Sequence, residues 1–462
     1  MSRITITLKD LFEIPSAIIY EPDKYASVSS ISIDSRSVKK NSLFVAIKGS
    51  DYDGHDFVFD AVKNGSSVVI IDKINLIRYD KLDITLVAVD DTIKAYGFLA
   101  NVWRNKLKAK VISITGSNGK TTTKEMLTDI LSQEYKVVKS LGNNNNHIGV
   151  PLTILSAKVG VDYLIIEHGT NHFGEINYTS EIASPDYSLI TNIGQSHLHY
   201  LKSTQGVYRE KSTLFYKTIE NKGIIFVNTD DKVLAANTKR IKSKITYGFH
   251  GKPDFKARIL SYDTNGKISL IIEHNLLKYQ FDLPICGESN AKNFLAALAV
   301  AFTLGLNEKS IYKAVLNFTS VEGRLNIEYF NDFILIDDTY NSNPDSMIAA
   351  LKLLSRIKKY KSKIAILGDM FELGERSVVL HKELKEYLLK YKLTDVLLIG
   401  KMMKYLELSV PESAGSVKHF RTRKSLENYL NHFPFTNSVI LVKGSRGMRM
   451  EEFVNVIKSR AA

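Results

Sequence analysis

The stretch that decides the fold is KVISITGSNGKTTTKEMLTDI, residues 110–130. An apolar run, a glycine-containing turn and a helical pattern follow one another, which is the order of a phosphate-binding loop. The general pattern has a glycine five residues before Gly119, but Ile114 stands there. We expect a shortened loop in which Lys120 reaches the β- and γ-phosphates of a nucleotide and the Thr121 hydroxyl binds Mg²⁺. The alternative is an ordinary strand-to-helix turn with an exposed lysine.

The segments around this loop predict an α/β protein. The apolar runs YLIIE, YSLITNI and GIIFVN lack strict alternation, as do FILIDD, KIAILGD, DVLLIG and SVILVKG further on. This is typical of strands buried on both faces of a parallel sheet. Shorter runs, SLFVAI, SSVVIID and ITLVAV, precede the loop. We predict an N-terminal domain at 1–88, a central doubly wound P-loop domain at 89–319 and a C-terminal Rossmann-like domain at 320–462.

Composition narrows the class of protein. The chain has 462 residues, 44% of them hydrophobic, which suits a globular protein of several domains. Cys286 is the only cysteine, so no intramolecular disulfide can form and a reducing, cytoplasmic location is expected. The longest apolar run, residues 294–306, would span only about 20 Å as a helix. The net charge of +13 permits a nucleic acid, an anionic membrane surface or a polyanionic substrate and does not choose among them.

Two polar stretches follow the loop. GNNNNHIGVP, residues 142–151, is either a polar turn region or the lining of a cleft that faces a polar ligand. Glu167 ends an apolar run, where open α/β sheets bind ligands, and a carboxylate there is explained if it holds a metal. The histidines nearby make a Glu/His metal shell plausible, although each one taken alone is more often a surface or core residue. They are His168, His172, His197 and His199.

With these residues in hand, the chain resembles the Mur ligases, the ATP-dependent amide ligases that build the peptidoglycan stem peptide. Thr115 to Thr121 spell that family's short loop, T-G-[ST]-[NS]-G-K-T, which accounts for the missing glycine. Four further stretches are similar in order and spacing, and the resemblance covers essentially the whole chain. They are DSRSVKKNSLFVAIKGSDYDGHDF (34–57), DDTYNSNPDSMIAAL (337–351), LGDMFELGERSVVLH (367–381) and VKGSRGMRMEEFV (442–454).

Within that family the resemblance is closest to the member that joins D-Ala-D-Ala to UDP-N-acetylmuramoyl-tripeptide through an acyl phosphate. It implies ATP and two Mg²⁺ ions, no nucleic acid, no membrane insertion and a monomer in the cytoplasm. One alternative is another amide ligase with a short loop, similar to folylpolyglutamate synthase, but those enzymes lack a counterpart of residues 34–57. An inactive or regulatory ATP-binding relative is another alternative.

The resemblance also implies site residues. Metal would be held by Thr121, Glu167, His197 and Lys211, the lysine as a carbamate, and catalysis would rest on Lys120, Glu167, His197 and Lys211. ATP would contact Thr115, Gly116, Ser117, Asn118, Gly119, Lys120, Thr121, Thr122, Asn290, Arg324 and Asp338. The other substrate would contact Ser35, Arg36, Asn145 and Asn146. The chain departs from the usual family residue at Thr213, His199, Ser289 and Glu322.

Overall fold

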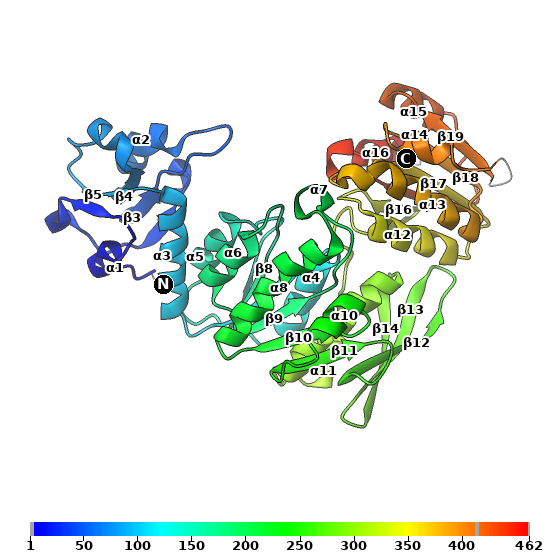
Figure 1. Cartoon of the computed structure of the whole chain (residues 1–462), viewed down its shortest axis with the longest axis horizontal. Helices are drawn as coiled ribbons and strands as arrows, with labels where there is room; N and C mark the ends of the chain where they lie inside the picture. Colours follow the sequence, from blue (N-terminus) through cyan, green and yellow to red (C-terminus); the bar gives the residue numbers. More distant parts are fainter. Residues whose placement is uncertain (1–3, 412–414, 461–462) are drawn as a thin grey trace.

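Three sheets organise the computed structural model, which describes residues 4–411 and 415–460 (Figure 1). They follow one another along the chain in an N-terminal, a central and a C-terminal unit. This confirms the predicted α/β class with three units. The domain limits at 88/89 and 319/320 stay a prediction. In the described part of the chain, no helix is long and apolar enough to cross a membrane.

The N-terminal sheet has the strand order β1-β5-β4-β3-β2, with β1 antiparallel to β5 and the other pairs parallel. Its strands are β1 (Ile18–Tyr20), β2 (Ser30–Ser32), β3 (Ser42–Val45), β4 (Ser66–Asp72) and β5 (Thr85–Val89). Its helices are α1 (Leu8–Phe12) and α2 (Val58–Lys63), with short 3₁₀ turns η1 (Pro22–Lys24), η2 (Ser35–Ser37), η3 (Gly54–Phe57) and η4 (Lys73–Arg78).

The central sheet has the order β14-β13-β12-β11-β10-β9-β6-β8-β7. Its parallel strands are β6 (Lys110–Thr115), β7 (Val137–Lys139), β8 (Tyr163–Glu167), β9 (Tyr187–Ile190), β10 (Ile224–Asn228) and β11 (Lys244–Gly248). A parallel pairing joins them to an antiparallel extension, which the apolar runs did not predict. It consists of β12 (Phe255–Tyr262), β13 (Lys267–His274) and β14 (Leu277–Cys286).

Helices cover both faces of the central sheet. Ile112 and Ile114 of β6 pack with α4 and α10, whereas Val111 of the same strand packs with α3, α5 and α6. The predicted burial on both faces is thus confirmed for this strand. The helices of this part are α3 (Thr92–Lys106), α4 (Lys120–Leu131), α5 (Gly149–Ser156), α6 (Glu175–Ala183), α7 (Leu198–Leu201), α8 (Thr204–Glu220), α9 (Lys232–Asn237), α10 (Glu288–Thr303) and α11 (Glu308–Val315).

The C-terminal sheet has the order β15-β16-β20-β17-β18-β19, parallel except for the edge strand β15. Its strands are β15 (Asn326–Tyr329), β16 (Phe333–Asp338), β17 (Ser362–Gly368), β18 (Asp395–Ile399), β19 (Ser416–Phe420) and β20 (Ser438–Lys443). Its helices are α12 (Pro344–Arg356), α13 (Ser377–Tyr391), α14 (Met403–Glu407), α15 (Arg423–Leu430) and α16 (Glu451–Ser459), with 3₁₀ turns η5 (Gly374–Arg376) and η7 (Arg446–Met448).

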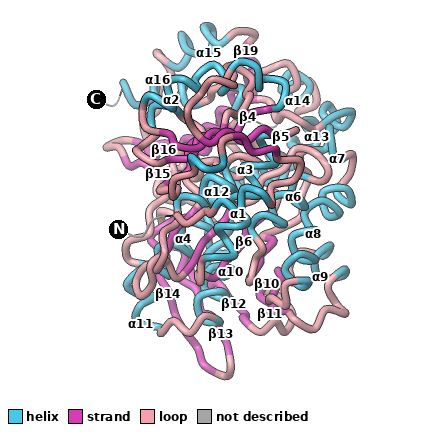
Figure 2. The backbone as a smooth tube through the Cα atoms, turned by 90° about the vertical axis from the view of Figure 1, so that its left-hand side faces the viewer, coloured by secondary structure: helices cyan, strands magenta, loops and turns pink. Residues whose placement is uncertain are grey.

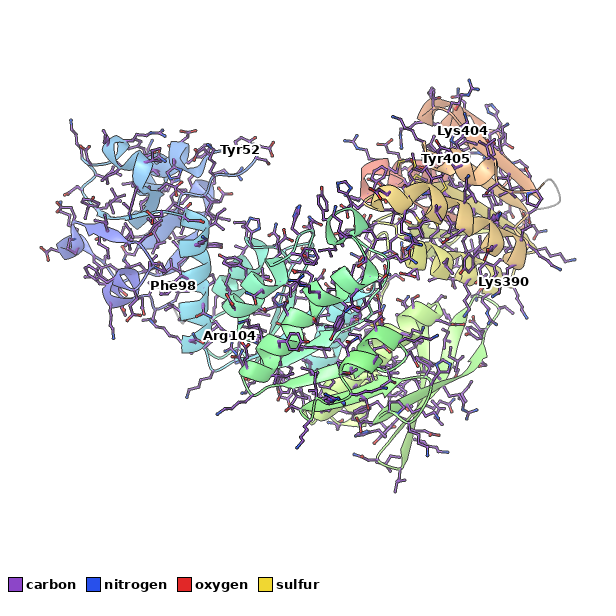
Figure 3. All side chains as sticks on the ribbon, in the orientation of Figure 1. Tyr52, Phe98, Arg104, Lys390, Lys404 and Tyr405 are labelled. Atoms are coloured by element: carbon purple, nitrogen blue, oxygen red, sulfur yellow. The ribbon has the colours of Figure 1, made fainter. Side chains whose placement is uncertain are left out.

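Buried contacts join the three units. One apolar cluster includes Val45 and Val87 of the N-terminal sheet, Leu99 of α3 and Ile166 of β8. Arg104, near the end of α3 (Figure 3), donates to the carbonyls of Ala183 and Ser184 and to Asp186. Helix α12 lies on the side of the C-terminal sheet that faces the central unit (Figures 1 and 2), and one apolar cluster runs from β9 and β10 through α12 into the C-terminal sheet. Buried apolar packing therefore joins the central and C-terminal units in part of their interface.

Strand register brings the functional loops together. In the central sheet Ile114 pairs with Glu167 and Thr115 pairs with Ile190, so β6, β8 and β9 end at one level. The loops that follow these strands must therefore meet at the same edge of the sheet, where open parallel sheets bind ligands.

Candidate nucleotide- and metal-binding cleft

A cleft of about 830 Å³ opens where the loops of the central sheet face those of the C-terminal sheet. It is lined by these predicted site residues: Ser117, Asn118, Gly119, Lys120, Thr122, Asn145, Asn146, Glu167, His197, Asn290, Arg324 and Asp338. The predicted residues Thr115, Gly116, Thr121 and Lys211 are buried and do not line the cleft. Strand register gathers the loops of the central sheet, and the packing of the C-terminal unit adds residues more than 200 positions away, such as Arg324 and Asp338.

The short loop between β6 and α4 owes its shape to two glycines. Gly116 and Gly119 have φ values of +148° and +83°, a region that side chains disfavour. A Cβ on Gly116 would lie 1.9 Å from Oγ1 of Thr191, and one on Gly119 would lie 2.3 Å from Oδ1 of Asn293. Ile114, where the general pattern has a glycine, is a buried strand residue instead. The loop is short because the strand continues up to Thr115.

Neighbouring side chains hold this loop in place. The Asn118 amide donates to Oδ1 of Asn192 at 3.0 Å, and the Asn118 carbonyl accepts from Oγ1 of Thr191 at 2.6 Å. Thr115 donates from its hydroxyl to the carbonyl of His168, so its side chain supports the loop from below. Lys120 folds across the loop and donates from Nζ to the carbonyl of Gly116 at 2.9 Å. The loop is thus preformed at the N-terminus of a helix, which suits an anion.

Glu167 presents a buried carboxylate at the edge of this loop. Its Oε1 accepts from Nδ2 of Asn145 at 3.0 Å, while its Oε2 is buried without a hydrogen-bond partner among the described residues. Nζ of Lys124, itself buried, lies 3.7 Å from that Oε2 and donates to the carbonyl of Ser140. The asparagine run therefore lines the cleft through Asn145. Asn146 lines it too, but its Oδ1 accepts from two amides at the start of α5.

Lys211 on α8 is a buried amine next to this carboxylate. Its ammonium has no hydrogen-bond or ion-pair partner in the described part of the chain, and only 1% of the residue is exposed. Burial, and secondarily the charge of Lys120, hold the pKa of Lys211 well below its usual value, although Glu210 and Glu167 oppose this. A lowered pKa favours the neutral amine, which is the form that reacts with CO₂.

Of the histidines that the sequence offered, only His197 lines the cleft. Its Nδ1 lies 2.6 Å from Oε2 of Glu372, in a direction outside hydrogen-bond geometry. The proximity of His197 lowers the pKa of Glu372. His172 is mostly exposed and contacts Glu175, and His199 packs edge-on against Tyr200.

His168 is a core residue. It lies between the hydroxyls of Thr179 and Ser113, and burial lowers its pKa to about 3. Because the folded pKa lies below the unfolded value near 6.5, the unfolded state binds the extra proton in this window. The contribution of the neutral His168 ring to the free energy of unfolding is therefore fully present above about pH 6.5 and is lost as the pH falls toward 3.

We expect the stability advantage of the wild type over His168→Gln to shrink by about 2 kcal/mol between pH 7 and pH 5. Urea unfolding of both proteins at each pH measures this difference. Parallel pH profiles for the two proteins would show that His168 is not buried in the neutral form.

The C-terminal unit supplies the opposite wall. Asp338 and Lys443 are paired neighbours on β16 and β20, and Nζ of Lys443 lies 2.6 Å from Oδ2 of Asp338. The guanidinium of Arg324 lies 4.0 Å from the ring centre of Tyr340, and its Nε is buried without a partner among the described residues. Asn290 also lines the cleft, but from the central unit, where it lies at the start of α10 and donates to the Cys286 carbonyl. The sequence did not point to two residues of this wall: Lys443, which pairs with Asp338, and Tyr340, whose ring contacts Arg324.

The predicted residues of the N-terminal unit stand apart from this cleft. Ser35 is buried in η2, whereas Arg36 is exposed and makes a two-point contact with Asp34. Tyr52, on the same unit, extends on the side that faces the C-terminal unit (Figure 3). Neither Ser35 nor Arg36 lines the cleft, so their predicted role would concern a distant part of a long substrate.

The residues at the cleft edge fit Mg²⁺. Mg²⁺ is usually bound by one or two carboxylates together with substrate phosphates and water, and the unpartnered Oε2 of Glu167 is such a donor. Residues 4–411 and 415–460 contain no cluster of three or more His, Cys, Asp or Glu in a metal-binding arrangement. The remaining oxygens must then come from the Thr121 hydroxyl, from the phosphates, from water or from a modified Lys211.

Fold and site together define a nucleotide-binding P-loop protein whose cleft is closed by a second α/β unit. Residues 27–104 match the Mur ligase family catalytic domain, 114–301 the Mur ligase middle domain and 323–446 the Mur ligase glutamate ligase domain. The chain belongs to the Mur ligase family. It is thus an ATP-dependent ligase that forms an amide bond.

Individual relatives cover nearly the whole chain. The UDP-N-acetylmuramoyl-tripeptide–D-alanyl-D-alanine ligase of Bacillus subtilis is 31% identical over 97% of both chains. A crystal structure of MurF from Acinetobacter baumannii superposes with a TM-score of 0.87 at 30% identity, covering 99% of this chain and 100% of the other. MurF ligase from Thermotoga maritima in complex with ADP gives 0.82 at 26% identity, covering 94% and 97%.

Proposed function

We propose that this ligase joins D-Ala-D-Ala to UDP-N-acetylmuramoyl-tripeptide and so makes the pentapeptide precursor of peptidoglycan, as a monomer in the cytoplasm. The observation that carries the proposal is the meeting of Lys120, Glu167 and the buried Lys211 beside one preformed anion site. The named relatives that match the chain from end to end support the choice of substrates.

The proposed reaction has two steps. A carboxylate oxygen of the tripeptide attacks the γ-phosphorus of ATP, the bond to the ADP oxygen breaks, and an acyl phosphate forms. The amine of D-Ala-D-Ala then attacks the acyl carbon, the amine loses a proton, and phosphate leaves with one oxygen of the former carboxylate. The product contains a new amide bond, and ADP and phosphate are released.

The first step brings an anion against a triphosphate, and this repulsion is costly in a cleft of low effective dielectric. Lys120 and the amides of the loop supply fixed positive charge where the phosphoryl oxygens develop negative charge. Mg²⁺, which Thr121, Glu167, His197 and a carbamate on Lys211 would hold as two ions, adds Lewis-acid stabilisation. Asn290 of α10 and, from the opposite wall, Arg324 and Asp338 would hold the nucleotide and exclude water from the acyl phosphate.

The test is product formation. The protein is incubated with ATP, Mg²⁺ and D-Ala-D-Ala together with UDP-tripeptides that carry lysine or diaminopimelate, and the products are weighed by mass spectrometry. We expect a pentapeptide with at least one tripeptide, and phosphate release that requires both substrates. Phosphate release that nucleic acid stimulates, with no pentapeptide, would contradict the proposal.

A further inference from the structure

Residues 369–375 of the C-terminal unit, which follow strand β17, contact the proposed metal-binding histidine. Glu372 of this loop lies 2.6 Å from Nδ1 of His197, and its backbone carbonyl accepts from the His199 amide at 2.9 Å. Both Glu372 and His197 line the nucleotide cleft. Side chain and backbone of one residue thus contact the segment that carries His197.

The backbone on both sides of this contact is strained. His197 has a φ of +53° and Glu372 a φ of +62°, so two non-glycine residues in the left-handed region face each other across the interface. Such conformations persist only where the surroundings determine them, and they gather at functional sites. Neither strand nor helix geometry requires them here, because both residues lie in loops or at a helix cap.

Packing holds the two segments at a fixed distance. Leu198 and Leu201 of α7 belong to the same buried cluster as Met370 and Leu373 of the facing loop. Gly374 approaches so closely that a Cβ there would lie 3.3 Å from Cα of His199. The backbone that carries Glu372 is therefore fixed by a packed interface, whereas its side chain remains 43% exposed.

We propose that Glu372 is a positioning residue, supplied by the C-terminal unit, which holds the His197 ring so that its Nε2 faces the metal position. A ligating histidine commonly donates its other ring N–H to a carboxylate, a backbone carbonyl or water, which fixes the ring and its tautomer. The Glu372 carboxylate lies at ion-pair distance from Nδ1 of His197, and a small rotation of either side chain would make the hydrogen bond. The inference rests on the proposed function. Its consequence is that the metal site is complete only when the C-terminal unit is docked.

The test compares Glu372→Gln with Glu375→Gln. Gln keeps the size of Glu372 and removes its charge, whereas Glu375 lies three residues further in the same segment and has no ion pair in the described part of the chain. The first measurement is the Mg²⁺ concentration for half-maximal ligation, beside the KM for ATP. The second is amide hydrogen exchange of residues 198–202 in the ligand-free protein.

We expect Glu372→Gln to raise the Mg²⁺ requirement about 10-fold or more and to speed exchange in this segment several-fold, with Glu375→Gln equal to the wild type. An unchanged Mg²⁺ requirement, unchanged exchange, or an equal shift in both variants would overturn the inference. A wild type that makes no pentapeptide would instead refute the proposed function, since the exchange measurement needs no substrate.

Discussion

Lys120→Met is expected to lower kcat/KM about 1,000-fold, because the variant loses the one ammonium that the short loop directs at the phosphates. Loss of one well-placed donor to a developing negative charge typically costs 10² to 10³ in rate. Lys120 also folds across the loop through Gly116, so nucleotide affinity should fall as well. Steady-state kinetics and binding of a fluorescent ADP analogue measure the two effects.

The matched control for this variant is Lys136→Met. Lys136 is an exposed lysine beyond the far end of α4, and it is outside the cleft. We expect wild-type kinetics for it. If Lys120→Met lost less than 10-fold while binding nucleotide normally, Lys120 would not stabilise the transferring phosphoryl group.

Lys211→Arg is expected to lower kcat by about 10² to 10³, although arginine is the natural amino acid most similar to lysine in length and charge. A guanidinium stays protonated and cannot form a carbamate, whereas burial lowers the pKa of Lys211 and favours the neutral amine that a carbamate requires. We expect the loss of this metal ligand to lower the rate about as much as the loss of one donor to the developing negative charge would. The wild type should also lose activity in buffer freed of CO₂ and regain it when bicarbonate is added.

Lys217→Arg is the control on the same helix, because Lys217 forms surface ion pairs with Glu181 and Glu220. It should respond to bicarbonate as the wild type does. Full activity of the wild type without CO₂, together with an active Lys211→Arg variant, would show that no carbamate takes part.

Much of the central site follows from local patterns. Glu167 is the last residue of an apolar run, so its position at the ligand-binding edge of the sheet could be predicted from that run alone. Lys211 could not, because one lysine in a helical pattern is nearly always solvated and only the packing around α8 buries it. The place of Lys124 beside the site could have been predicted from the sequence. It lies one helical turn after Lys120 and therefore on the same face of α4.

Contacts between the units could not be predicted from local sequence patterns. Glu372 and His197 meet only because two separate sheets dock, and no local periodicity records that docking. The antiparallel extension of the central sheet is a different case. Residues 267–274 alternate in burial, and Asn265-Gly266 stands at the hairpin that joins β12 to β13, which is a recognised turn signal.

The central claim is that the acid is activated as an acyl phosphate beside the short loop. It is tested most directly with UDP-tripeptide whose reacting carboxylate carries ¹⁸O in both oxygens, incubated with ATP, Mg²⁺ and D-Ala-D-Ala. Mass analysis of the released phosphate should find one ¹⁸O atom for each pentapeptide formed, because phosphate leaves with a carboxylate oxygen. Phosphate free of ¹⁸O beside a normal yield of pentapeptide would contradict the claim.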